Sequence, residues 1–228
     1  MYHQNNTRVN TIKVCIVEDD PEFQEWLSEE LAEASHIECL GIFSVAEDAM
    51  AKIPVLRPNI VLMDLGLEKS SIGGIECMLR LKLVSPELRF MVVTSYGDDE
   101  KVFEALKVGA GAYILKGDIS RSLIDRLDEF SRGGAPMSAE IARKVITTFH
   151  REAADLALLQ QLSPREKDIL DLLAKGFMYK EIAGMLHNEN DQSKTISEGT
   201  VKIHAFNVYQ KLQVNSRIEA MKKYLNRI

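Results

Sequence analysis

The stretch IVLMDLGLE, residues 60–68, places a carboxylate directly after an apolar run. Residues 60–63 are all apolar, which is typical of a strand buried on both faces of a parallel sheet. Asp64 follows at once. This acid either marks the point where a core strand meets solvent or is a reactive group at the rim of a sheet, and the surrounding sequence favours one of these two interpretations.

Four more short apolar runs accompany this strand, at residues 11–17, 37–43, 90–94 and 111–115. Stretches with helical periodicity separate them, and a further helix is expected at 119–130. Five strands that alternate with five helices predict an α/β fold, in which helices cover both faces of a parallel sheet.

The strand ends carry a distinctive set of polar side chains. Glu18 and Asp19 follow the first strand, Asp64 follows the third, Thr94 ends the fourth and Lys116 follows the fifth. Any single strand can end in polar residues. In a parallel sheet, however, function lies beyond the carboxyl ends of the strands. Acids, a hydroxyl and a lysine together therefore indicate a site.

Three converging carboxylates repel one another. At about 4 Å and an effective dielectric near 20, each pair costs on the order of 4 kcal/mol. A divalent cation relieves this repulsion, and all-oxygen ligands suit Mg²⁺. A carboxylate beside Mg²⁺ can attack a phosphoryl group and form an aspartyl phosphate. Lys116 and Thr94 could then bind the phosphoryl oxygens, and Tyr113 could swing toward space vacated by Thr94 as a two-state element.

The segments CIVEDDP, IVLMDL, MVVTS and AYILKG resemble the receiver domain of two-component response regulators. The resemblance covers most of residues 10–132 and implies a doubly wound five-stranded sheet of strand order 2-1-3-4-5. It also implies that a sensor histidine kinase phosphorylates Asp64. The implied acid pair is Glu18 and Asp19, the implied switch residues are Thr94 and Tyr113, and the implied phosphate-binding lysine is Lys116. Mg²⁺ would be bound by Asp19, Asp64 and the Gly66 carbonyl, and by Glu18 through water.

The sequence departs from the receiver pattern beside the expected site. Glu68 and Ile72 stand where the family usually has proline and glycine, and the Gly-Gly pair falls at 73 and 74. This spacing indicates a two-residue insertion. Gly117 follows the lysine, where many receivers have proline.

A linker is expected at residues 133–161. It begins with the breaker cluster SRGGAPMS and continues with a short helical run behind Ser138, a possible N-cap, and then a polar and aliphatic connector. From residue 162 the helical period returns without any strand pattern. Four helices in residues 162–228 predict a small all-helical domain.

This helical tail resembles the LuxR-type helix-turn-helix of the NarL/FixJ subfamily, through LSPRE, KEIA, SEGTVKIH and KLQV in that order. A stripe of apolar residues from Val201 to Leu212 should face the core. Lys202, Ile203 and Phe206 should face outward, where they could contact bases in a major groove or, alternatively, a partner protein. The candidate phosphate contacts are Lys180 and Thr200. The last helix, 216–225, resembles the family's dimerisation helix and implies a homodimer.

The turn of this helix-turn-helix is unusually long. HNENDQSKT precedes Ile196 and adds roughly eight residues to the usual three or four. These residues are polar and acidic, so a flexible loop near the DNA is expected. We hypothesise that it alters docking or tunes affinity.

Charge and composition agree with this division. Residues 1–131 carry 13 Lys and Arg against 23 Asp and Glu, a net charge of −10, whereas residues 163–228 carry 11 against 8, a net charge of +3. Only the second part is therefore a candidate for binding nucleic acid. The three cysteines are expected to be reduced core residues, and the five histidines lack a metal-ligand spacing. Neither a membrane span nor a signal core is found in the sequence. These features predict a cytoplasmic protein without a membrane partner.

The sequence thus predicts a transcription regulator whose binding to promoter DNA is controlled by phosphorylation of Asp64. It is expected to be no enzyme apart from Mg²⁺-dependent self-phosphorylation and dephosphorylation. Two alternatives remain: a receiver that acts without phosphate as a protein-interaction module, and a Mg²⁺-dependent phosphatase with an aspartyl nucleophile. The phosphatase usually places its nucleophile after the first strand, with a second aspartate two residues later, where this chain has Gly66.

Overall fold

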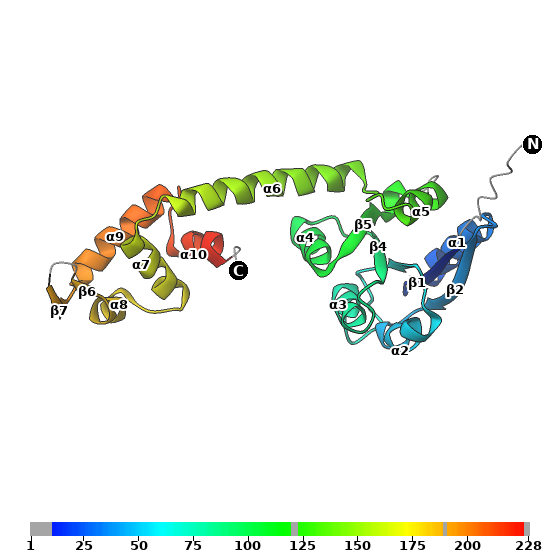
Figure 1. The fold of residues 1–228 in the computed structure, drawn as a ribbon, viewed down its shortest axis with the longest axis horizontal. Helices are drawn as coiled ribbons and strands as arrows, with labels where there is room; N and C mark the ends of the chain where they lie inside the picture. Colours follow the sequence, from blue (N-terminus) through cyan, green and yellow to red (C-terminus); the bar gives the residue numbers. More distant parts are fainter. Residues whose placement is uncertain (1–10, 120–122, 189–190, 226–228) are drawn as a thin grey trace, which may run out of the picture. The chain divides into compact units, whose positions relative to one another are not determined.

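The computed structural model describes residues 11–119, 123–188 and 191–225 (Figure 1). The chain divides into two compact units, and the boundary falls between Val145 and Ile146. We call them the first and the second unit. Residues 1–10, in which no signal core is expected, and residues 120–122 of the helix expected at 119–130 lie outside the described residues.

The first unit is built on a five-stranded parallel sheet. Its strands are β1 (Ile12–Val17), β2 (Ile37–Phe43), β3 (Ile60–Met63), β4 (Arg89–Thr94) and β5 (Ala110–Leu115), in the order β2-β1-β3-β4-β5. Each strand lies within a residue or so of the predicted run. Four of these runs are largely buried, whereas the edge strand β2 is buried only at Ile37 and Phe43. The predicted fold and strand order are confirmed.

Helices cover both faces of the sheet. On one face, α1 (Pro21–Ala32) and α5 (Leu123–Ser131) pack in a core with residues such as Leu27 and Leu127. On the other face lie α2 (Ala46–Leu56), α3 (Gly74–Val84) and α4 (Asp99–Val108). A 3₁₀ turn, Lys116–Asp118, follows β5. Two apolar layers therefore hold the strand ends in fixed positions.

The three cysteines are free, but they differ in environment. Cys15 and Cys77 are buried, as predicted, whereas Cys39 is exposed. Cys39 lies on β2, which is an edge strand of the sheet. The prediction that all three are core residues is therefore wrong for Cys39.

The segment after α5 returns to the sheet and adds a short parallel bridge to its edge. Met137 pairs with Tyr113 of β5: the Tyr113 amide donates to the Pro136 carbonyl and the Ser138 amide donates to the Tyr113 carbonyl, both at 3.1 Å. We call residues 136–138 the strap. The Ser138 hydroxyl accepts from the Leu115 amide at 3.1 Å, so this side chain ties the strap to β5.

A single helix, α6 (Ala139–Gln160), follows the strap (Figure 1). The prediction of a short helical run followed by a connector is wrong, because the helix continues for 22 residues. Residues 150–160 are rich in Ala and Leu and contain neither Gly nor Pro, so nothing in them ends a helix. The unit boundary falls inside this helix.

The second unit contains the four predicted helices, which are α7 (Pro164–Ala174), α8 (Tyr179–Met185), α9 (Glu198–Lys211) and α10 (Arg217–Leu225). Ser163 and Glu166 form a capping box at the start of α7. The predicted helical unit is confirmed, and it carries one addition: β6 (His187–Asn188) and β7 (Asp191–Thr195) form a short antiparallel hairpin between α8 and α9.

Candidate functional site

The register of β1 and β3 brings two acids together. Val17 pairs with Met63, and the Asp64 amide donates to the Val17 carbonyl at 2.8 Å, so Glu18 and Asp64 leave the sheet side by side. Carboxylate oxygens of Glu18, Asp19 and Asp64 lie within 4.8 Å of one another. Glu18 and Asp64 are almost fully buried, at 1% and 6% exposure, and Asp19 is half-buried.

Lys116 reaches this acid cluster from the end of β5. Its Nζ lies 2.8 Å from Glu18 Oε2 and 2.9 Å from Asp64 Oδ2. The same nitrogen lies 4.4 Å from the centroid of the Phe23 ring. The repulsion that the sequence predicts between these carboxylates is therefore offset in part by a lysine ammonium held between two of them.

Burial and hydrogen bonding shift the ionisation of this group of residues. Burial raises the pKa of Glu18 to about 7, against the lowering effect of its hydrogen bond with Lys116. Burial also raises the pKa of Asp64, but hydrogen bonds from Lys116, Thr94 and the Gly66 amide outweigh it and hold that pKa below its usual value. Asp64 is thus a buried carboxylate that stays ionised at neutral pH, as a nucleophile must.

Thr94 and Tyr113 connect the acid cluster to the loop after β4. Thr94 is fully buried, and its hydroxyl accepts from the Tyr96 amide at 3.4 Å. The Tyr113 ring is also fully buried, and its hydroxyl donates to the Tyr96 carbonyl at 2.7 Å. Both expected switch residues therefore contact the main chain of Tyr96.

The loop of residues 66–73, in which the insertion was predicted, folds over the acids. The Lys69 amide donates to Asp19 Oδ2 at 3.3 Å, and Lys69 Nζ donates to the Asp19 carbonyl. The Gly66 carbonyl, an expected metal ligand, accepts the Glu68 amide at 2.9 Å. The Ser70 hydroxyl accepts from Ala46 at the start of α2. Sequence reasoning missed Lys69, because its contact depends on how this irregular loop closes.

Two glycines allow close approaches beside the site. A Cβ on Gly66 would lie 2.7 Å from the Tyr96 ring, and a Cβ on Gly74 would lie 2.0 Å from the Asp64 carbonyl oxygen. Gly74 therefore lets the start of α3 rest against the backbone of Asp64. The shifted Gly-Gly pair was a visible signal for this contact, but only the structure shows which glycine makes it.

The first turns of α6 contact the loop after β4, and the strap contacts β5. Lys144 Nζ donates to the Gly97 carbonyl, and Lys144 also pairs with Glu140 at 2.7 Å. Ile141 is fully buried in the core beside Tyr113. Sequence reasoning assigned these residues to a linker, because no local pattern ties them to β5.

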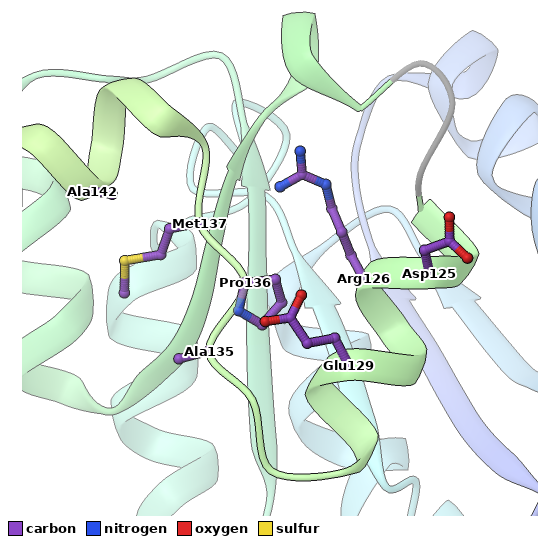
Figure 2. A pocket seen from close by; sticks show the side chains of 7 residues that line it. All are labelled: Asp125, Arg126, Glu129, Ala135, Pro136, Met137 and Ala142. Carbon is purple, nitrogen blue, oxygen red and sulfur yellow. The ribbon is translucent and has the colours of Figure 1, made fainter.

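Two of the hollows on the described part of the first unit bear on the position of the site. One, of about 460 Å³, is lined by the acid cluster, by Lys116 and by residues of the loop, among them Gly66 and Lys69. The other, of about 530 Å³, lies between α5 and the segment that includes the strap (Figure 2). Asp125, Arg126 and Glu129 face it from α5. None of the expected site residues lines this second hollow, so the candidate site belongs to the first.

Helix α9 has the two faces that its sequence predicts. The inward stripe of Val201, Ala205, Val208 and Leu212 is fully or almost fully buried. On the opposite side Ile203 and Phe206 are 63% and 60% exposed. Lys202 is exposed too and pairs with Glu198 at 2.8 Å. The arrangement leaves two large apolar side chains and a cation on an exposed helix face.

The two expected phosphate contacts have different surroundings. Lys180 is exposed in the first turn of α8. Thr200 is half-buried, and its hydroxyl lies 2.9 Å from that of Ser197, which caps α9. Thr200 thus belongs to the N-terminal cap of α9. In helix-turn-helix proteins, the N-terminal residues of the recognition helix are the ones that contact bases.

The long turn between α8 and α9 is a hairpin, so the expectation of a flexible loop is corrected for the residues described. The Ile196 amide donates to the Leu186 carbonyl at 3.0 Å, and His187 pairs with Thr195. Leu186 and Ile196 pack against the core of α7, α8 and α9. The hairpin is therefore anchored at its base, while α8 and α9 keep their mutual packing.

Family comparisons match both units. Residues 14–128 match the response regulator receiver domain, and residues 160–223 match the bacterial regulatory proteins of the luxR family. The chain belongs to the response regulators of the NarL/FixJ type. The sequence resemblance is confirmed for both units of this response regulator.

Relatives and solved structures agree with this assignment. The response regulator is similar to the response regulator protein VraR of Staphylococcus aureus strain Mu3, at 33% identity over 92% of this chain and 95% of that protein. VraR of strain COL is 32% identical over the same shares. RcsB of Salmonella typhimurium shares the fold, with a TM-score of 0.59 and 21% identity over 96% of this chain and all of that one.

In the described part of this response regulator, no helix is both long and apolar enough to cross a membrane.

Proposed function

We propose that this response regulator is a phosphorylation-controlled transcription regulator, and that Asp64 accepts the phosphoryl group from a sensor histidine kinase. One observation carries the proposal: Asp64 is a buried, ionised carboxylate that contacts Lys116 and lies beside Glu18 and Asp19. The Asp64 carboxylate attacks phosphorus, and the bond to the kinase histidine breaks as the new P–O bond forms.

The donor set fits Mg²⁺, because the clustered ligand atoms are all carboxylate oxygens. Asp19, Asp64 and the Gly66 carbonyl would bind the ion directly, and Glu18 through water. When bound, Mg²⁺ supplies positive charge that shields the nucleophile and the phosphoryl oxygens from each other. Lys116 stays within reach of the same oxygens, so it would bind the phosphoryl group once Asp64 carries it.

We infer that Thr94 and Tyr113 transmit the effect of phosphorylation of Asp64 to α6. A Thr94 hydroxyl that turns to a phosphoryl oxygen releases the Tyr96 amide, and Tyr113 holds the Tyr96 carbonyl. Lys144 donates a hydrogen bond to the neighbouring Gly97 carbonyl, so movement of the loop after β4 would displace the first turns of α6. The strap, which pairs with Tyr113 itself, supplies a second route from the site to α6.

The second unit would bind double-stranded promoter DNA. Lys202, Ile203 and Phe206 form the exposed face that would enter the major groove, and Lys180 and Thr200 would position it on phosphates. RcsB has been solved bound to a promoter with the phosphomimetic BeF₃⁻, and as two dimers on two DNAs. By analogy we expect this chain to bind as a homodimer, in the cytoplasm where promoters lie. Beyond self-phosphorylation and dephosphorylation we assign it no enzymatic activity.

Labelling tests this proposal against its alternatives. The full chain is incubated with acetyl phosphate and Mg²⁺, and bound phosphate is measured in the wild type, in Asp64→Asn and in Asp48→Asn, an exposed control on α2. We expect one acid-labile phosphate that Asp64→Asn loses and Asp48→Asn keeps, and a genomic DNA footprint that depends on the phosphodonor. Rapid multiple turnover would instead support a phosphatase, and absence of labelling a phosphate-independent interaction module.

A further inference from the structure

The hollow over the acid cluster contains more acids than cations. Five of its lining residues are acids and two, Lys69 and Lys116, are lysines. The phosphoryl group of a phosphodonor is itself negatively charged, so its entry into this hollow is opposed by electrostatic repulsion. The cations of the hollow therefore influence how readily a phosphodonor binds.

The two lysines differ in what their ammonium groups contact. Lys116 Nζ lies 2.8 Å from one carboxylate oxygen and 2.9 Å from another, so nearby negative charge offsets most of its own. Lys69 Nζ instead donates to the main-chain carbonyl of Asp19, which carries no net charge. Lys69 is also exposed. Its positive charge is therefore the one that an ion meets on approaching the hollow from solvent.

The loop that contains Lys69 is tied down on both sides of the acid cluster. The Ser70 hydroxyl accepts from the Ala46 amide at 2.8 Å, and the Ser71 amide donates to Glu47 Oε1 at 3.0 Å, so the loop is bound to the start of α2. The Lys69 amide donates to Asp19 Oδ2 at 3.3 Å. These contacts hold the backbone of Lys69 at the hollow, although its side chain lies on the surface.

We propose that Lys69 is a binding residue for the phosphodonor: its ammonium attracts the anionic phosphoryl group into the hollow and, by the same charge, opposes the binding of Mg²⁺ beside Asp19. This inference deepens the proposed function and rests on it. A unit charge acts on an anion and on a cation with opposite sign. Lys69 should therefore strengthen the binding of one and weaken the binding of the other.

A lysine with only a structural role would behave differently. Asp19 is an expected Mg²⁺ ligand, and the bond from Lys69 Nζ supports its main chain. If that support were the whole contribution of Lys69, its removal would loosen Asp19 and weaken the binding of Mg²⁺. The direction of the change in Mg²⁺ affinity therefore separates the two roles.

Two constants of the full chain test the proposal. Titration calorimetry measures the dissociation constant of Mg²⁺ without any phosphodonor, and initial labelling rates at saturating Mg²⁺ give the KM for acetyl phosphate. We expect Lys69→Met to lower the Mg²⁺ dissociation constant about threefold and to raise the KM about threefold at low salt, and both changes to shrink as salt rises.

Two further variants serve as controls. Lys69→Arg keeps the charge and should stay near the wild type in both constants. Lys107→Met removes the same charge from an exposed position in the last turn of α4, away from the hollow, and should leave both constants unchanged.

Three outcomes would overturn the proposal. Weaker Mg²⁺ binding in Lys69→Met would reduce Lys69 to a support for Asp19. Unchanged constants in Lys69→Met would deny its charge any effect, and equal shifts in Lys107→Met would assign the effect to the net charge of the chain. Failure of the proposed function is distinguishable from these, because the wild type itself would then take up no phosphate at Asp64, and the inference would fall with it.

Discussion

Lys116 offsets part of the negative charge of the acid cluster, because its ammonium contacts two buried carboxylates. Burying a charge costs several kcal/mol unless it is paired, so Glu18 and Asp64 depend on this lysine for their stability in the fold. Burial lowers the pKa of Lys116, but hydrogen bonds to both acids outweigh burial and hold this pKa above its usual value. Lys116 therefore stays protonated at neutral pH. A phosphoryl group on Asp64 would keep a negative partner for Lys116, and the pairing could persist through the reaction.

Gly74 is the residue beside the site at which substitution should cost most. A Cβ there would lie 2.0 Å from the Asp64 carbonyl oxygen and 2.8 Å from Leu65 Cα. These are backbone atoms, which cannot turn aside as a flexible side chain can. We expect Gly74→Ala to lower the free energy of unfolding of the first unit by about 1–3 kcal/mol and to slow labelling of Asp64. Urea unfolding and the labelling rate measure the two effects.

Gly73→Ala is the matched control for this prediction, since a Cβ at Gly73 meets its nearest atom, the Leu65 carbonyl oxygen, at 3.7 Å, which is ordinary contact. It should unfold and become labelled nearly as the wild type does. Equal losses in both variants would attribute the effect to the start of α3 in general and would contradict the role given to the contact with Asp64.

The hairpin β6–β7 is an added element, and we expect its net negative charge to oppose DNA binding. Residues 188–195 include Glu189, Asp191 and Lys194, so their removal raises the net charge of the second unit by one. The base of the hairpin is held by Leu186 and Ile196, which lie outside the deleted residues. We expect deletion of 188–195 to leave the helices folded and to strengthen binding to an arbitrary duplex several-fold at low salt, with the gain fading as salt rises.

Asp191→Asn separates charge from structure in this experiment, because it removes one acid and keeps the length of the chain. It should reproduce part of the gain in affinity, measured by fluorescence anisotropy over a series of salt concentrations. If deletion instead weakens binding at every salt concentration, the hairpin contacts the DNA, and its charge does not govern the affinity.

The elements differ in how well sequence alone predicts them, for physical reasons. Residues 60–63 are fully buried, and the runs of β1, β4 and β5 are largely buried, so their composition marks them clearly. The hairpin is made of polar residues without alternation, and its pairing is fixed by the anchors at its base. Helix α6 was predicted too short, because its second half has high helix propensity but no cap or periodic pattern that identifies it.

The residues of the candidate site also differ in how well the sequence predicts them. Glu18, Asp64 and Lys116 follow strands, and strand ends in a parallel sheet meet at one rim, so their convergence was predictable. Lys69 and Lys144 reach the site region through an irregular loop and through a helix that begins after the sheet is complete. Such contacts depend on tertiary packing, which leaves no periodic signal in the sequence.

Over the whole molecule, α6 is the element that the two units share. The boundary between the units falls within this helix, at Val145 and Ile146, and its first turns contact the loop after β4, beside the acid cluster. A continuous helix can carry a displacement from one unit to the other, because its backbone hydrogen bonds resist bending. Control of DNA binding by Asp64 should therefore depend on an unbroken α6.

Thr147→Pro tests this dependence, because Thr147 is exposed and lies in the interior of α6. Proline removes a backbone hydrogen bond and clashes with the preceding turn, at a cost of about 3 kcal/mol. We expect labelling of Asp64 and basal affinity for DNA to stay near wild type, while the change in affinity caused by the phosphodonor is largely lost. Thr147→Ala, which preserves the helix, should retain that change. A proline variant that still responds fully to phosphorylation would show that the signal reaches the DNA-binding unit without passing along α6.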